Sequence, residues 1–198
     1  MSKTLLLMRH AKSSWKDKSL KDELRPLKNR GELAAAAMGV ILKENELVPQ
    51  LILSSPAVRA RRTADIVAKK CGYKHDIQDV PAFYMAEPPV FFETLKTLDD
   101  KLERVLVVAH NPGLEALLQH LDGHVDALPT GALAYLNLDI HHWSELDPST
   151  NADLIGFWDP ESDHAKEIED EMAKDKKDKK DKDHKKEKDG KKDKKSKK

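Results

Sequence analysis

Short apolar segments alternate with segments of helical periodicity along the first 121 residues of the chain. The segments 4–8, 50–55 and 104–110 are rich in Leu, Ile and Val and predict strands, and 74–80 predicts a weak strand. The segments in which apolar residues recur at helical spacing are 31–45, 56–72, 88–100 and 113–121. Strands that alternate with helices predict a mostly parallel sheet with helices on both faces. We therefore predict the α/β class, in a three-layer α/β/α arrangement.

Two later apolar segments, 132–140 and 152–159, predict strands joined by a hairpin or meander loop. The end of the chain is different. Residues 166–198 contain sixteen Lys and eleven Asp or Glu, a net charge of +5 that the remaining residues balance to give zero for the whole chain. Such a segment cannot bury enough apolar surface to offset the entropy of ordering it. We expect a folded domain over 1–162 and a Lys/Asp-rich disordered tail over 163–198.

The cysteine content and the hydropathy of the sequence indicate the cellular compartment. Cys71 is the single cysteine, so no disulfide can form within the chain, which fits a reducing compartment. No signal-peptide core precedes Arg9, and no run approaches the roughly 20 apolar residues of a membrane-spanning helix. We expect a cytoplasmic protein that acts as a monomer and has no membrane partner.

Polar residues follow the predicted strands where buried strands would end. Arg9 and His10 follow the first strand, His110 follows the strand 104–110, and Arg59 lies in the first turns of the helix after the second strand. Ligands of open parallel sheets bind beyond the carboxyl ends of the strands, so these side chains are expected to converge if the strands are neighbours.

The chemistry of this set favours phosphate. Arginine offers a planar fork of donors that matches phosphate oxygens, and a helix N-terminus adds free backbone N–H groups. Histidine can act as a neutral nucleophile towards phosphorus near pH 7. Taken singly, each residue has a plainer interpretation: Arg9 and His10 as surface residues, His110 as a hydrogen-bonded core histidine. Arg61 and Arg62 are best interpreted as a solvated helix face.

Four motifs, in this order, carry a resemblance: "LLLMRHAKSSW", "RPLKNRG", "LILSSPAVRARRTADIV" and "VLVVAHNPGLEALL". Together they resemble the histidine phosphatase superfamily, which also contains the cofactor-dependent phosphoglycerate mutases. The resemblance is strongest to the small SixA-type phosphohistidine phosphatases, and it spans about residues 3–160. It implies the phosphoglycerate mutase-like fold in a compact form. The charged tail has no counterpart in that family.

The resemblance also implies roles for named residues. His10 would be the nucleophile that becomes transiently phosphorylated, and Arg9 and Arg59 would hold the phosphoryl oxygens. His110 would be a further phosphate ligand that stabilises developing charge. Arg25 would contact the substrate, although a loop arginine paired with an acid explains it equally well. The implied mechanism needs no metal and no cofactor.

The middle segment departs from the wider family. Phosphoglycerate mutases carry an acid there that protonates an alcohol leaving group, and Glu87 is the nearest candidate here, without a clear motif around it. An alkoxide leaves poorly without a proton donor, whereas imidazole leaves more readily. Glu87 therefore stays a possible proton donor. Its poor context favours phosphoramidate over phosphomonoester substrates.

Three functions remain open. The first is a phosphatase that hydrolyses phosphohistidine on a signalling or phosphotransfer protein. The second is a phosphomonoesterase acting on another protein or on a small phosphorylated substrate. The third is an interaction protein that acts through its Lys-rich tail. Tight binding of nucleic acid is disfavoured, because the eleven acids of residues 166–198 limit the net charge of the tail to +5.

Overall fold

The computed structural model describes residues 2–123, 127–172 and 174. Within them, six strands form one sheet in the order β3-β2-β4-β1-β5-β6. The strands are β1 Lys3–Arg9, β2 Leu51–Ser54, β3 Gln78–Asp79, β4 Arg104–Ala109, β5 Leu133–Leu138 and β6 Ala152–Trp158. Strands β1 to β4 run parallel to one another. β5 runs antiparallel to β1, and β6 runs antiparallel to β5. The mostly parallel sheet and the late hairpin are confirmed.

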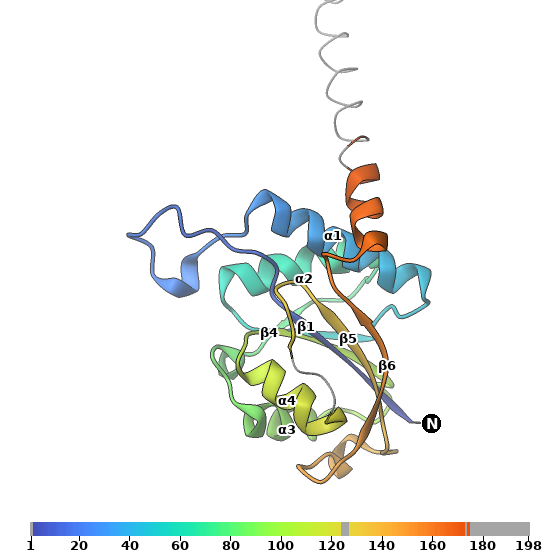
Figure 1. Cartoon of the computed structure of the whole chain (residues 1–198). Helices are drawn as coiled ribbons and strands as arrows, with labels where there is room; N and C mark the ends of the chain where they lie inside the picture. The colour runs from blue at the N-terminus through green and yellow to red at the C-terminus, as the bar shows by residue number, and fades with distance from the viewer. Residues whose placement is uncertain (1, 124–126, 173, 175–198) are drawn as a thin grey trace, which may run out of the picture.

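Helices cover both faces of this sheet, which gives three layers. The α-helices on the two faces are α1 Asn29–Glu44, α2 Val58–Cys71, α3 Pro88–Leu95 and α4 Gly113–Asp122, and short 3₁₀ helices lie at Asp22–Leu24, Pro81–Phe83 and Trp143–Glu145. α1 and α2 lie on one face of the sheet, and α3 and α4 lie on the other (Figure 1). The predicted three-layer α/β/α class is confirmed. In the described part of the chain, no helix combines the length and the apolar character needed to cross a membrane.

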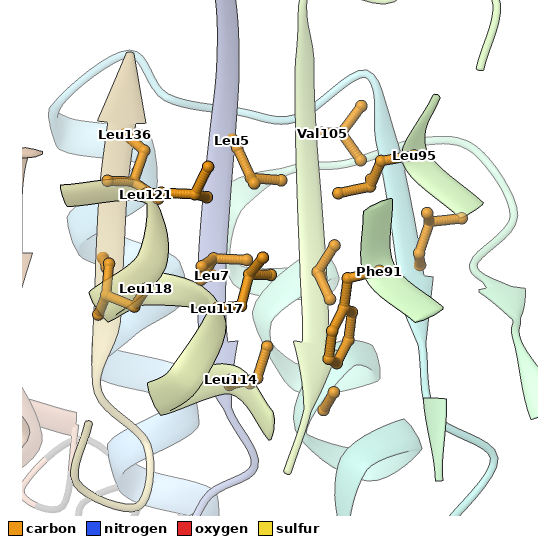
Figure 2. Close-up of a cluster of buried hydrophobic side chains, with 14 of the residues drawn as sticks. Leu5, Leu7, Phe91, Leu95, Val105, Leu114, Leu117, Leu118, Leu121 and Leu136 are labelled. Carbon is orange, nitrogen blue, oxygen red and sulfur yellow. The ribbon is translucent and has the colours of Figure 1, made fainter. Parts of the chain in front are cut away.

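Alternate residues of β1 enter two separate cores. Leu5 and Leu7 belong to the cluster under α3 and α4, where leucines of α4 and Phe91 and Leu95 of α3 pack on the sheet (Figure 2). Leu6 and Met8 belong to the cluster under α1 and α2. All four side chains are fully buried. A strand buried on both faces reads as an unbroken apolar run, which explains the sequence of β1.

A helix follows the predicted domain boundary at residue 162. Residues 163–172 form a helix that lies beside α1 (Figure 1), and His164 forms an ion pair of 3.6 Å with Glu44 of α1. Ala165 is fully buried and Ile168 is 8% exposed, and Met172 packs on the same core. These three residues share one face of a helix, while the charged residues between them face outward. The remainder of the predicted tail, 173 and 175–198, lies outside the described residues.

Candidate active site

The carboxyl ends of three neighbouring strands meet at the predicted site. β4 lies between β2 and β1, and the parallel register pairs Arg9 of β1 with Ala109 of β4. His10 and His110 follow these two strands directly, and their ring centroids lie 5.1 Å apart. Ser55 follows β2, and its hydroxyl lies 2.8 Å from Nε2 of His110. The topology therefore brings together side chains that lie a hundred residues apart in sequence.

One hydrogen bond fixes the tautomer of His10. Nδ1 lies 2.8 Å from the backbone oxygen of Ala11, which can only accept, so Nδ1 carries the ring proton. Nε2 presents its lone pair and accepts a hydrogen bond of 3.2 Å from Nε of Arg59. Burial lowers the pKa of His10 to about 4; the hydrogen bond to Ala11 opposes this shift, and the nearby arginine charges reinforce it. At neutral pH the ring is uncharged and can act as a nucleophile.

His110 lies against His10 on one side and the ring of Tyr84 on the other, at 5.6 Å and edge to face. Its Nδ1 is buried and has no hydrogen-bond partner among the described residues. In the tautomer in which the Ser55 hydroxyl donates to Nε2, Nδ1 carries the ring proton and can donate it to a ligand. Burial lowers the pKa of His110 to about 3, and the charge of His10 adds to the effect. His110 is therefore neutral at pH 7, and in that tautomer it is a hydrogen-bond donor beside the nucleophile.

Three arginines, of which Arg25 and Arg59 are buried and Arg9 is partly buried, surround the two histidines. Arg59, 3% exposed, is the second residue of α2, and Arg25 is 5% exposed. Arg9 donates from Nη1 to the backbone oxygen of Leu128 at 3.0 Å. Three buried donors in this set, Nε of Arg9 and both Nε and Nη1 of Arg25, have no hydrogen-bond partner within the described residues. Buried donors without partners are rare in folded proteins, and the oxygens of a bound anion would supply acceptors for them.

Asp22 joins two of these arginines at the edge of the site. Its Oδ2 accepts hydrogen bonds from Nη2 of Arg59 at 2.8 Å and from the Tyr84 hydroxyl at 2.9 Å. Its Oδ1 lies 3.2 Å from Nε of Arg25. Partial burial raises the pKa of Asp22, but the hydrogen bond from Tyr84 and the arginine charges outweigh it and hold that pKa below its usual value. Asp22 is therefore ionised at neutral pH.

Comparisons with known proteins agree with this geometry. The family model for the histidine phosphatase superfamily, branch 1, matches residues 5–83. An uncharacterized chloroplastic protein of Arabidopsis thaliana is 35% identical over 154 residues, which cover 73% of this chain and 71% of the relative. An uncharacterized protein of Mycobacterium leprae is 30% identical over 166 residues, 77% of this chain and 99% of the relative. This chain belongs to the histidine phosphatase superfamily.

Solved structures place this histidine phosphatase among SixA-like folds. A protein from Agrobacterium tumefaciens described as a phosphohistidine phosphatase SixA is 26% identical, with a TM-score of 0.69 over 81% of this chain and 99% of that chain. A SixA-type structure from Nakamurella multipartitia has a TM-score of 0.72 at 23% identity and covers 82% and 98% of the two chains. An α-ribazole-5′-P phosphatase fold from Escherichia coli matches with a TM-score of 0.58 at 17% identity, over 77% and 94% of the two chains. The family and these folds make the chain a phosphatase with a compact phosphoglycerate mutase-like fold.

Most of the predicted site residues of this histidine phosphatase come together. The structure gathers Arg9, His10, Arg25, Arg59 and His110 in one cluster. Arg25 lies in the cluster and also pairs with an acid, Asp22, and its contact with substrate stays a prediction. Its guanidinium also stacks on the exposed ring of Trp15, 3.4 Å from the ring centroid. The cluster has the composition expected of a phosphate site.

Other predicted residues lie outside the cluster. Glu87 is exposed at the residue before α3, and no hydrogen bond or ion pair joins it to the site in the described part of the chain. Arg61 pairs with Asp65 and Asp79, and Arg62 pairs with Glu32. These arginines of the histidine phosphatase lie on the outer face of α2, as the sequence predicts.

Sequence reasoning missed four residues that organise the site, namely Asp22, Ser55, Thr63 and Tyr84. The buried Thr63 accepts a hydrogen bond from the backbone N–H of Ala11 and donates to the backbone oxygen of Arg59. It therefore ties the loop after His10 to the turn that holds Arg59. The position of Asp22, three residues before Arg25, was a usable signal for an ion pair. No pattern in the sequence indicated the contacts of Tyr84.

Proposed function

We propose that this phosphatase hydrolyses phosphohistidine on a partner protein through a covalent phosphohistidine at His10. The observation that carries the proposal is the state of His10. Its Nδ1–H is held by the backbone oxygen of Ala11, so that a neutral Nε2 lone pair faces the arginine cluster. A fixed tautomer aligns the nucleophile before substrate arrives, which removes part of the entropic barrier.

The proposed reaction has two displacements at phosphorus. Nε2 of His10 attacks the phosphorus atom, and the P–N bond of the substrate breaks with its electron pair passing to the leaving imidazole. Arg9, Arg25 and Arg59 hold the phosphoryl oxygens, and Nδ1–H of His110 donates to the charge that develops there. Water then attacks the phosphorus of the enzyme phosphohistidine, inorganic phosphate leaves, and His10 regains its neutral state.

Two features support phosphohistidine as the substrate. Among the described residues, Asp22 is the acid bound to the arginines of the site, and its lowered pKa keeps it ionised and unsuited to protonating an alkoxide. Glu87 is exposed outside the site. Imidazole needs less help to leave than an alkoxide does. The likeness to the SixA-type structure at 26% identity points in the same direction.

The alternative is a phosphomonoesterase of unknown small-molecule or protein substrate, with Glu87 as the proton donor. The α-ribazole-5′-P phosphatase fold among the similar structures favours this alternative. The two functions separate in the Glu87→Gln variant. It should lose phosphomonoesterase activity if Glu87 is the acid, and it should keep its activity towards phosphohistidine.

The third reading, an interaction protein acting through the Lys-rich tail, rests on residues 175–198, which lie outside the described part. The complete cluster of arginines and histidines argues against it as the main function. We retain two further expectations as proposals, a cytoplasmic location, which the single cysteine supports, and a monomeric state.

Trapping of the intermediate tests the proposed function. The protein is mixed with a ³²P-labelled phosphohistidine protein, quenched quickly in alkali and separated by size. We expect label on the enzyme that is stable in alkali and released by acid, and none on His10→Asn. The matched control is His141→Asn, which changes an exposed histidine outside the site. A His10→Asn protein that keeps its turnover would contradict the mechanism.

A further inference from the structure

A carboxylate stands at the edge of a site built for an anion. Asp22 is bound by both Arg25 and Arg59, two of the arginines that would hold phosphate. A negative charge there repels a phosphate and competes with it for the same guanidinium donors. A site selected for tight binding of any phosphate would be better without it. We therefore expect this carboxylate to interact favourably with a group that some phosphorylated substrates have and others lack.

Asp22 lies on the solvent side of the cluster. Its side chain is 41% exposed, whereas the side chains of Arg25 and Arg59 are 6% and 4% exposed and His10 is buried. In an in-line displacement, the leaving group lies on the side of phosphorus opposite the nucleophile. Because His10 is buried, a substrate that enters from solvent carries its leaving group on the outer side. The leaving group of a bound substrate would thus approach Asp22.

Asp22 is also held from two directions. The Tyr84 hydroxyl donates to Oδ2 from the segment between β3 and α3, and Arg59 reaches both Oδ2 and the backbone oxygen of Asp22 from α2. Oδ1 faces Nε of Arg25 in an ion pair without hydrogen-bond geometry. A carboxylate that is fixed in place and ionised, with an oxygen still able to accept, suits recognition of an N–H group.

We propose that Asp22 recognises the imidazole leaving group of phosphohistidine and thereby selects it over phosphoesters. This inference rests on the proposed function. Asp22 accepts a hydrogen bond from the ring N–H that is distal to phosphorus, and its charge favours the protonated, cationic ring. A phosphoester offers no such donor, and it meets the repulsion of the carboxylate without compensation.

The step balances without a further reactant. The substrate enters with phosphorus on one ring nitrogen and a proton on the other. Nε2 of His10 forms the new P–N bond while the old P–N bond breaks, and its electron pair passes to the leaving nitrogen. The distal proton stays on the departing ring, which leaves as neutral imidazole. Asp22 keeps its charge throughout, so that it acts by hydrogen bonding and electrostatics and not as a proton donor.

A plainer role is that Asp22 only positions Arg59. The two roles differ in what they predict for two substrates. A positioning residue acts on the phosphoryl group, so its loss reduces turnover of all substrates in the same proportion. A residue that binds the leaving group changes the ratio between substrates. Loss of the carboxylate should also relieve the competition for Arg25 and Arg59, so that inorganic phosphate inhibits at lower concentration.

The test measures kcat/KM of the full-length protein towards free phosphohistidine and towards p-nitrophenyl phosphate, for the wild type, Asp22→Asn and Asp22→Ala. Asp17→Asn is the control, because Asp17 lies in the same loop and bonds only to Ser19 among the described residues. We expect the ratio of phosphohistidine to ester activity to fall on the order of tenfold or more in both Asp22 variants. It should not change in Asp17→Asn. Inhibition by inorganic phosphate is measured in each variant. Inhibition at a lower concentration in the Asp22 variants indicates an intact arginine cluster, and weaker inhibition indicates a disturbed one.

Three outcomes would overturn the inference in distinguishable ways. An unchanged ratio with both activities reduced makes Asp22 a positioning residue for Arg59. An unchanged ratio with both activities retained removes any role for it. A wild type that hydrolyses the ester and not phosphohistidine refutes the proposed function itself, and the leaving-group role with it.

Discussion

A single ring proton determines the chemistry available to His10. The carbonyl oxygen of Ala11 accepts a hydrogen bond from Nδ1–H of His10. Burial and the nearby arginine charges lower the pKa of His10 to about 4, which keeps the ring neutral. The same arginines would attract the phosphoryl group towards the lone pair on Nε2. The features that suppress protonation of His10 are thus the features that bind its substrate.

Arg59 is the residue whose geometry should matter most after His10, because its Nε faces the nucleophile while its two Nη atoms reach Asp22. Arg59→Lys keeps the charge and loses the planar set of donors. We expect kcat/KM to fall on the order of a hundredfold, as measured by steady-state phosphatase assays. Arg62→Lys, on the exposed face of the same helix, should retain wild-type activity. Equal activity in the two variants would refute the assignment of Arg59.

The buried histidines also predict how stability depends on pH. The pKa of His110 is about 3 in the folded state and about 6.5 in the unfolded chain, so the unfolded state binds more protons between these values. Stability is therefore fully present above pH 6.5 and falls as the pH decreases. Each such histidine contributes a slope of about 1.4 kcal/mol per pH unit.

Urea unfolding at several pH values between 6 and 4 measures this slope. We expect the free energy of unfolding to depend less steeply on pH in His110→Gln than in the wild type. The exposed His141→Gln should keep the wild-type slope. A wild-type slope in His110→Gln would mean that His110 is not held neutral.

At the scale of elements, Thr63 links α2 to the loop that follows β1. Thr63→Val preserves shape but leaves the buried N–H of Ala11 without its acceptor. We expect the variant to lose about 1–3 kcal/mol of unfolding free energy and to lose activity as His10 shifts. Thr94→Val is the control, since the Thr94 hydroxyl donates only to Val90 within α3 in the described structure. Denaturant unfolding and activity assays on both variants would check this, and equal effects would count against a special role for Thr63.

The elements also explain what the sequence could and could not predict. Convergence of His10, Arg59 and His110 was predictable, because strand-end residues of neighbouring parallel strands must meet at one edge. Asp22 begins a 3₁₀ helix of three residues and Tyr84 follows another, and segments this short have no periodicity from which to tell which side chains meet. Glu87 was a candidate proton donor only because it lies in the middle segment of the chain. Whether it reaches the site depends on the path of the loop before α3, which the sequence does not predict, and the structure leaves it exposed.

For the molecule as a whole, the helix at 163–172 lies beyond the domain boundary that the sequence predicts. Averaged over residues 163–198, composition predicts disorder, but a stripe of Ala165, Ile168 and Met172 is enough to hold one helix against the core. A short apolar stripe is lost in an average over a long charged segment. The net charge of a segment and its ability to pack are therefore separate properties.

Two truncations test where the domain ends. Removal of 175–198 should leave the melting temperature and the phosphatase activity unchanged, whereas removal of 163–198 uncovers the core beside α1 and should lower the melting temperature by several degrees. Ile168→Ala in the full chain should cost about 2 kcal/mol, because it empties a buried position. Thermal unfolding followed by circular dichroism measures all three. If both truncations melt like the full chain, the helix at 163–172 contributes nothing to stability, and the boundary belongs at residue 162 after all.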